Sequence, residues 1–251
     1  MRINNNLMAM NANRALGINN TGMAKSLEKL SSGLRINRAG DDAAGLSISE
    51  KMRAQIRGLN MASKNAQDGI SLIQTAEGAL DETHAILQRM RELAVQAAND
   101  TNASVDRSSL QDEIEELIAE LDRIATKTQF NEKVILDGRY VSGGTSGKLE
   151  FHVGANANEV ISIEIGDMKA DALGISGTNG TSGTSGTNGT NGTKVSDVNI
   201  TTKAGANSGI QIIDAAIKQV SAQRSKLGAV QNRLEHTIRN LDNAAENLQA
   251  A

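Results

Sequence analysis

The 251-residue chain contains no cysteine, no proline and no tryptophan, and its aromatic residues are Phe130, Tyr140 and Phe151. Without cysteine it can form no disulfide, thiolate metal site or thiol nucleophile. Without proline, nothing forces a break into a long helix. Aromatic side chains supply much of the volume of a thick core, so their scarcity favours thin helix-to-helix seams built from Ala, Leu, Ile, Val and Met. The composition predicts long helices rather than a thick globule.

A strong charge and long apolar runs are also missing. The formal net charge is −3, whereas a nucleic-acid binder draws much of its affinity from basic contacts to phosphate. No apolar run approaches the roughly 20 residues that span a bilayer. The start, MRINNNLMAMNANRAL, has no apolar core of a cleaved signal peptide. We therefore predict no nucleic-acid partner and no membrane partner, and export would need a route without a cleaved N-terminal signal.

Two long stretches carry a hydrophobic repeat of 3.5 residues. Alternating steps of three and four from Leu59 to Ala97, and from Ile210 to Leu248, each meet ten apolar residues in twelve positions. Such a repeat is typical of coiled-coil packing. A shorter stripe runs from Leu110 to Ile124. The predicted helix seam contains Leu59, Ile73, Leu80, Leu87, Met90, Ile213, Ile217, Val220, Leu227, Leu234, Ile238 and Leu241.

Local signals set the predicted ends of these helices. Gly40 interrupts the helical pattern. Asp41 or Asp42 can then cap a helix that begins near Ala43, because a carboxylate accepts hydrogen bonds from the free N–H groups of the first turn. The polar stretch 99–104 reads as a turn, so the third helix should return antiparallel, and a last helix at about 208–250 should lie along both. The predicted fold is mainly α: an elongated antiparallel coiled-coil helical bundle.

The repeat shortens to two residues between the third and last helices. LEFHV at 149–153 and ISIEI at 161–165 alternate apolar and polar residues around a loop, which predicts a small β-hairpin region. Residues 177–193 contain only Gly, Thr, Asn and Ser, a composition with nothing to bury, so we predict a flexible surface loop.

Together these patterns predict four parts. They are an N-terminal segment at 1–42, a helical rod at 43–140 plus 204–251, a β-hairpin region at 141–176 and a flexible loop at 177–203. The N-terminal segment has only a loose amphipathic pattern, interrupted by glycines that each cost roughly 1 kcal/mol of helix stability. We therefore expect it to be a marginal helix that needs a partner.

Four segments of the chain resemble the bacterial flagellins. The segments are KLSSGLRINRAGDDAAGLSISEKMRAQIRGL (29–59), SKNAQDGISLIQTAEGALDETHAILQRMRELAVQAAN (63–99), TQFNEKVILDG (128–138) and QRSKLGAVQNRLEHTIRNL (223–241). The stretch 149–168 is similar to the short flagellins of Gram-positive bacilli. The resemblance implies a structural subunit of the flagellar filament that serves motility, is exported unfolded through the flagellar type III channel and is added under a cap protein.

The same resemblance implies further partners: other flagellin subunits, the cap and hook-junction proteins, the export apparatus and a vertebrate Toll-like receptor. Flagellins also continue into another helical segment beyond the position of Ala251, and this segment pairs with the N-terminal one. We therefore expect weakened self-assembly of this chain and an N-terminal segment without its natural partner. The alternative is a hook–filament junction protein or another flagellar accessory protein, which shares fragments of the terminal pattern.

The resemblance points to one exposed surface. At 100° per residue, Gln88, Arg89, Glu92 and Gln96 face away from the seam, and Leu93 flanks it. By matching motif, Arg89, Leu93 and Glu113 are the candidate receptor contacts, on a surface that also lies between filament neighbours. The residues alone favour a solvated helix face with an Arg89–Glu92 pair. Opposite charges also occur on two separate helices. The second helix carries the basic residues Lys51, Arg53, Arg57 and Lys64, and the third helix is acidic. These charges either steer the docking of subunits or form solvated helix faces.

Catalytic chemistry has no signature in this sequence. The three histidines are far apart, and no H-E-x-x-H, phosphate-binding loop or nucleophile elbow is present. We predict no enzyme activity, cofactor or metal, and His84 and His236 are expected to be packing residues. The resemblance also implies possible O-linked sugars on the exposed loop, at Thr178, Thr181, Ser182, Thr184, Ser185 and Thr187.

Overall fold

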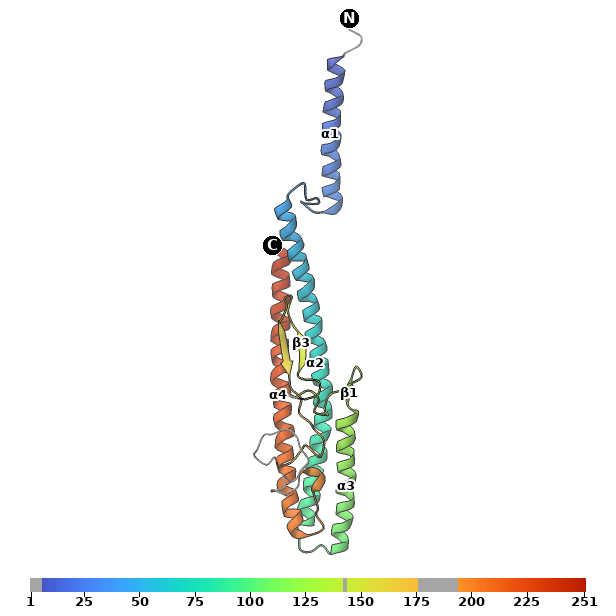
Figure 1. Cartoon of the computed structure of the whole chain (residues 1–251), viewed down its shortest axis with the longest axis vertical. Helices are drawn as coiled ribbons and strands as arrows, with labels where there is room; N and C mark the ends of the chain where they lie inside the picture. The colour runs from blue at the N-terminus through green and yellow to red at the C-terminus, as the bar shows by residue number, and fades with distance from the viewer. Residues whose placement is uncertain (1–5, 142–143, 176–193) are drawn as a thin grey trace. The chain divides into compact units, whose positions relative to one another are not determined.

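The computed structural model describes residues 6–141, 144–175 and 194–251 (Figure 1). The chain divides into two compact units. One contains Met1–Arg57 and Ala245–Ala251, and the other contains Gly58–Ala244. The sequence predicted a boundary at residue 42, at the start of the second helix, whereas the units divide fifteen residues further along that same helix.

The first unit begins with a helix that buries none of its residues, α1 (Leu7–Ser32). The Asn6 side chain caps its start by accepting a hydrogen bond from the Ala9 N–H at 3.3 Å. Gly33 ends it in the left-handed conformation at a φ of 68°, where its N–H reaches the Lys29 carbonyl. The apolar side chains of α1 remain exposed, among them Leu7, Met8, Leu16 and Leu30. This helix agrees with the expectation of a segment that needs a partner.

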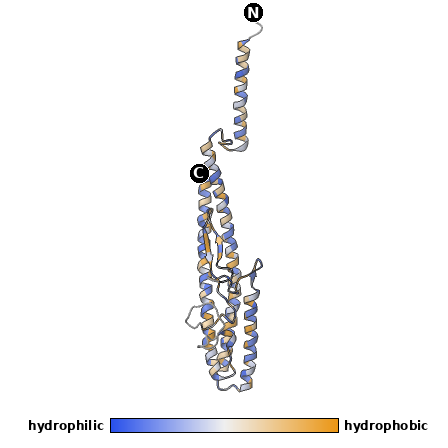
Figure 2. Cartoon of the chain, viewed as in Figure 1, coloured by the Kyte–Doolittle hydropathy of each residue, from blue (hydrophilic) through white to orange (hydrophobic). Residues whose placement is uncertain are grey.

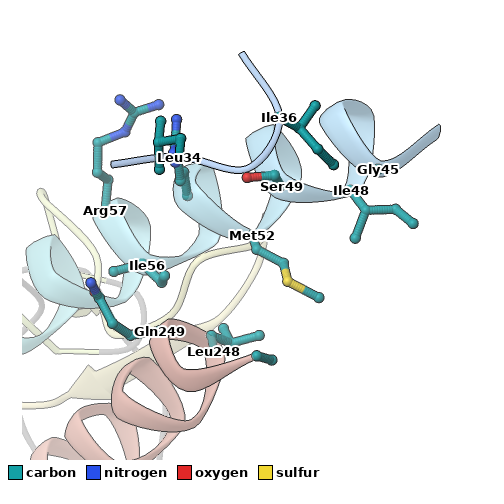
Figure 3. A pocket seen from close by; sticks show the side chains of 12 residues that line it. Leu34, Ile36, Gly45, Ile48, Ser49, Met52, Ile56, Arg57, Leu248 and Gln249 are labelled. Carbon is teal, nitrogen blue, oxygen red and sulfur yellow. The ribbon is translucent and has the colours of Figure 1, made fainter. Parts of the chain in front are cut away.

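The second helix, α2 (Ala43–Ala97), starts in the same unit. As predicted, Asp42 caps it, since its Oδ1 accepts the Gly45 N–H at 3.0 Å. The first turns of α2, the preceding loop and the last turn of the final helix surround a groove of about 650 Å³ (Figure 3). Its apolar lining consists of Leu34, Ile36, Ile48, Met52, Ile56 and Leu248.

The second unit is a bundle of α2, α3 (Ser104–Lys127) and α4 (Lys203–Ala250) (Figure 1). Lys203 Nζ at the start of α4 lies 2.5 Å from Asp100 Oδ2, just after α2. Near the other end, Ser63 Oγ donates to Asp242 Oδ1 at 3.2 Å. The start of α4 thus lies beside the end of α2, and the later part of α4 lies beside the earlier part of α2, so the two helices are antiparallel. The fold class predicted from the sequence, an antiparallel helical bundle with a small hairpin, is confirmed.

The hydrophobic seam occupies the centre of this bundle. Eleven of the twelve positions of α2 are buried, and Leu59 is half-buried. On α4 the positions from Ile210 to Leu241 alternate between half-buried and buried, so one position of each heptad points into the seam and the next lies at its edge. Figure 2 shows the result as apolar and polar stripes that alternate along each helix. Among the described residues no helix is long and apolar enough to cross a membrane.

A hairpin lies on the helices at the predicted place. Strands β3 (Leu149–His152) and β4 (Val160–Ile163) pair antiparallel, with Leu149 opposite Ile163. Asn65 of α2 donates to the His152 carbonyl at 3.1 Å, and Gln223 of α4 donates to the Glu164 carbonyl at 2.9 Å. The hairpin is therefore fastened to both long helices.

A second, shorter hairpin was not predicted. It consists of β1 (Gln129–Phe130) and β2 (Lys133–Val134), joined by Asn131 and Glu132 with φ values of 48° and 64°. Strands of two residues are too short to show an alternating pattern. The turn has positive φ angles, which usually mark a glycine, but it contains none, so the sequence carries no turn signal.

The prediction of a flexible loop at 177–203 is wrong for residues 194–202. Val195, Val198 and Ile200 are buried around the short 3-10 helix η1 (Val195–Asp197). The Gln111 side-chain amide holds this segment, since Oε1 accepts the Ile200 N–H at 2.9 Å and Nε2 donates to the Val198 carbonyl at 3.2 Å. The apolar residues that follow the Gly/Thr repeat bury enough surface to order the backbone.

The last helix also begins earlier than predicted. It starts at Lys203 instead of about Ser208, because the Thr202 hydroxyl accepts the Gly205 N–H at 3.1 Å and caps it. The predicted loop at 177–193, with the six glycosylation candidates from Thr178 to Thr187, lies outside the described residues.

Candidate functional site

The candidate surface is centred on Arg89, which links two helices. Its Nε donates to Glu113 Oε1 of α3 at 3.0 Å, and its Nη2 lies 2.8 Å from the same oxygen. Its Nη1 lies 3.3 Å from Glu92 Oε2 one turn further along α2. The hydrogen bond and the charge of Glu113 raise the pKa of Arg89 above its usual value. A single cation is thus shared by two carboxylates on an exposed face.

The neighbouring polar residues point to solvent, as predicted. Gln88, Glu92 and Gln96 are exposed. Gln88 Nε2 lies 2.9 Å from His84 Nε2, while the backbone carbonyl of Gln96 accepts a hydrogen bond from Asn102 Nδ2 at 2.6 Å. The side chains of Glu92 and Gln96 are therefore accessible to a partner. Glu92 also contacts the exposed Arg89.

Leu93 is not part of this surface, and its burial contradicts the prediction that it is a receptor contact at the flank of the seam. Its side chain is 1% exposed and lies in the core cluster with Ile114 of α3. On a helix wheel Leu93 falls between the seam and Arg89, on the side that α3 covers. The helix α2 packs against α3 and α4 at once, so its apolar stripe is wider than a two-helix seam. The stripe from Leu110 to Ile124 was the signal that could have revealed this.

A second ion pair joins α2 to α4, on the side of α2 away from α3. Arg91 Nε lies 2.6 Å from Asp214 Oδ1 of α4. Gln88, Arg91, Glu92, Asp214 and Ile217 line a groove of about 330 Å³ there. The sequence did not reveal the pairing of Arg91 with Asp214, because the register between α2 and α4 cannot be read from either helix alone.

The acidic residues of α3 fall into two groups. Glu113 binds Arg89, Glu120 binds Arg123 at 2.5 Å, and Asp122 Oδ1 accepts the Ala170 N–H at 2.8 Å. By contrast, Asp112, Glu115 and Glu116 are exposed and form no salt bridge with any described residue. Half of the predicted acidic face is therefore structural, and the other half is available to a partner.

The two histidines that were predicted to be packing residues differ in their surroundings. His84 is half-buried, and its buried Nδ1 has no hydrogen-bond partner among the described residues. His236 is exposed rather than packed, with its Nδ1 3.4 Å from Arg239 Nη2. The described residues contain no group of three or more potential metal ligands.

The chain is similar to known proteins along its whole length. Residues 3–140 match the family model of the bacterial flagellin N-terminal helical region, and residues 210–251 match that of the C-terminal helical region. A flagellin of Bacillus subtilis (strain 168) is 56% identical over 266 residues, which cover 100% of this chain and 85% of the relative.

Solved structures agree with this likeness. The crystal structure of Bacillus cereus flagellin is 30% identical with a TM-score of 0.53, over 71% of this chain and 88% of that one. A putative flagellar hook-associated protein from Vibrio parahaemolyticus has a TM-score of 0.66 over 85% of this chain and 98% of that one, but at 14% identity it shows a shared fold alone. The two matching family regions and the B. subtilis relative decide the assignment: this chain belongs to the bacterial flagellin family.

Proposed function

We infer that this chain is a structural subunit of the bacterial flagellar filament, which assembles with other flagellin subunits outside the cell and serves motility. The observation that carries this function is the likeness to flagellins over the whole chain. The exposed apolar side chains of α1 agree with it, because a helix that buries nothing in its own chain is stabilised by burial against partners. When unlike faces of successive subunits meet, the contact does not close, and an open helical polymer results.

We propose that the partners extend beyond other subunits. They include the cap and hook-junction proteins at the filament ends and the flagellar export apparatus. The flagellin family is structural, and we propose that this chain has no catalytic activity. A peptidase assay with a chelator control tests the last point, and chelator-sensitive cleavage would contradict it.

Electron microscopy of seeded growth tests the filament function. The purified chain is incubated with short flagellar seeds, beside a version extended at its C-terminus by a flagellin helical segment. We expect filaments from the extended version, because the added helix offers apolar surface to the exposed apolar side chains of α1. Growth from both versions would show that the chain needs no extension. Growth from neither would contradict the proposed function and favour a junction protein.

We also propose that the surface formed by Gln88, Arg89, Glu92, Gln96 and Glu113 binds a flagellin-sensing Toll-like receptor. Arginine is frequent among residues that dominate interfaces, and here it is held in place by Glu113 from the neighbouring helix. A preorganised side chain loses less entropy on binding than a free one. Leu93 has no part in this contact because it is buried.

Substitutions on this surface should separate binding from folding. We expect the pair Arg89→Ala and Glu113→Ala to reduce receptor signalling by roughly tenfold or more, as loss of an interface anchor does. The exposed Glu82→Ala on the same helix is the matched control, and far-ultraviolet circular dichroism checks that all variants stay helical. Unchanged signalling by the double variant would remove this surface from the receptor contact.

A further inference from the structure

The β3–β4 hairpin lies beside α4 (Figure 1). A groove with a positive rim lies between the residues of the hairpin and those of α4. Its volume is about 370 Å³. Lys226 and Arg233 stand two turns apart on one face of α4, separated by about 10 Å of helix rise. Lys148 and Glu164 lie on the hairpin side. The floor between the charged side chains is largely apolar and consists of Ile163, Leu227, Ala229 and Val230.

The charges of this basic groove are not balanced within the chain. Lys148 Nζ lies 2.7 Å from Glu164 Oε1. The hydrogen bond and charge of Lys148, and then the charge of Lys226, lower the pKa of Glu164, so Glu164 remains an anion that Lys148 neutralises. Lys226 and Arg233 form no salt bridge with any described residue. Two cations therefore flank an apolar floor without a counter-charge in contact.

The complementary charge is present on another face of the same chain. Asp112, Glu115 and Glu116 project from α3 at spacings of three and four residues, at which like charges repel each other. None of the three has a cationic partner among the residues that the structure describes. Ala119, one turn beyond Glu115, is exposed beside the acidic side chains and offers a small apolar contact. This acidic face matches the basic groove in sign, with a small apolar residue at its end.

We propose that the basic groove of one chain receives the acidic α3 face of a second copy. The proposal rests on the filament function and goes further by naming two of the surfaces that meet between subunits. Because the two faces differ, their contact is heterologous and can repeat from copy to copy without closing. Opposite charges across the contact would orient approaching subunits and make association depend on salt. The apolar floor would then supply the short-range contact.

Site-specific cross-linking tests the proposal, and the absence of cysteine makes each introduced thiol unique. Chains with Ala229→Cys in the groove are mixed with chains with Ala119→Cys on α3, and a short bis-maleimide reagent is added. At low salt, about 20 mM, we expect at least a tenfold higher yield of joined chains than with Ala85→Cys, an exposed alanine on α2. The yield should fall at about 500 mM salt, where charges are screened within a few ångströms.

Charge exchange supplies the second measurement. Lys226→Glu with Arg233→Glu in the groove chain should reduce the cross-linking yield about tenfold. Asp112→Lys with Glu116→Lys in the other chain should restore it, which a variant that failed to fold could not do. A yield equal to that of the Ala85→Cys control, or one unaffected by charge reversal and salt, overturns the proposal. Seeded growth of the C-terminally extended chain is followed in parallel, so filaments without the cross-link refute only this contact, and absence of both refutes the filament function as well.

Discussion

Replacement of Leu87 with alanine should lower the free energy of unfolding by about 2–5 kcal/mol, the cost of a large-to-small change in a packed core. Leu87 is fully buried in the seam between the helices. Loss of its side-chain atoms removes their transfer free energy, and the long helices on either side cannot close the space. Urea unfolding followed by circular dichroism measures the change, provided that the slope with denaturant stays the same.

Val95→Ala is the matched control for this change. Val95 lies on the same helix and is 49% exposed, so its truncation leaves no cavity and should alter stability by about 0.5 kcal/mol or less. Similar losses for both variants would mean that the seam does not hold the second unit together.

Gly69→Val should destabilise the same unit by about 1–3 kcal/mol, because it overpacks the place where the hairpin rests on α2. A Cβ at Gly69 would lie 3.2 Å from Phe151 Cδ1 and 3.4 Å from Leu234 Cδ1. Valine would add two methyl groups beyond that atom. The ring of Phe151 must then move away, and the hairpin with it. Thermal unfolding and hydrogen exchange of the hairpin amides would show the change.

Gly78→Ala gives the opposite expectation on the same helix. A Cβ there meets nothing within 4 Å, so the alanine should stabilise the helix by about 0.5–1 kcal/mol through its better helix propensity. If Gly69→Val were as stabilising as Gly78→Ala, the close approach of Phe151 to α2 would be refuted. The sequence pattern places Gly69 on the seam and Gly78 off it, and the neighbours of each glycine in the structure decide the sign of the effect.

The sequence identified the features that depend on a repeat along one segment. The 3.5-residue seam of α2 and α4 and the alternation in β3 and β4 each follow from side-chain direction within a single element. The cap of α2 was narrowed to Asp41 or Asp42, and Asp42 provides it. The exposed positions Gln88, Arg89, Glu92 and Gln96 were found in the same way as the seam. A helix period states which residues face away from the seam whatever covers the seam itself.

The candidate site could be predicted only in part, because a repeat along one helix does not show which residues of another helix it meets. Arg89 and Glu113 lie on different helices, and family resemblance, not periodicity, brought them together in the prediction. Their hydrogen bond and the Arg91–Asp214 pair depend on the register between helices. That register is set by packing between segments far apart in the chain.

The sequence by itself determined that this protein is a helical flagellin with a seam, a hairpin and an exposed polar face, because these follow from local periods and from matching segments. Only the tertiary structure decided that Leu93 is buried, that residues 194–202 are packed and that Lys226 and Arg233 flank a groove. The physical reason is that a period gives the direction of a side chain from its own axis. What that side chain then meets depends on which other segment folds against it.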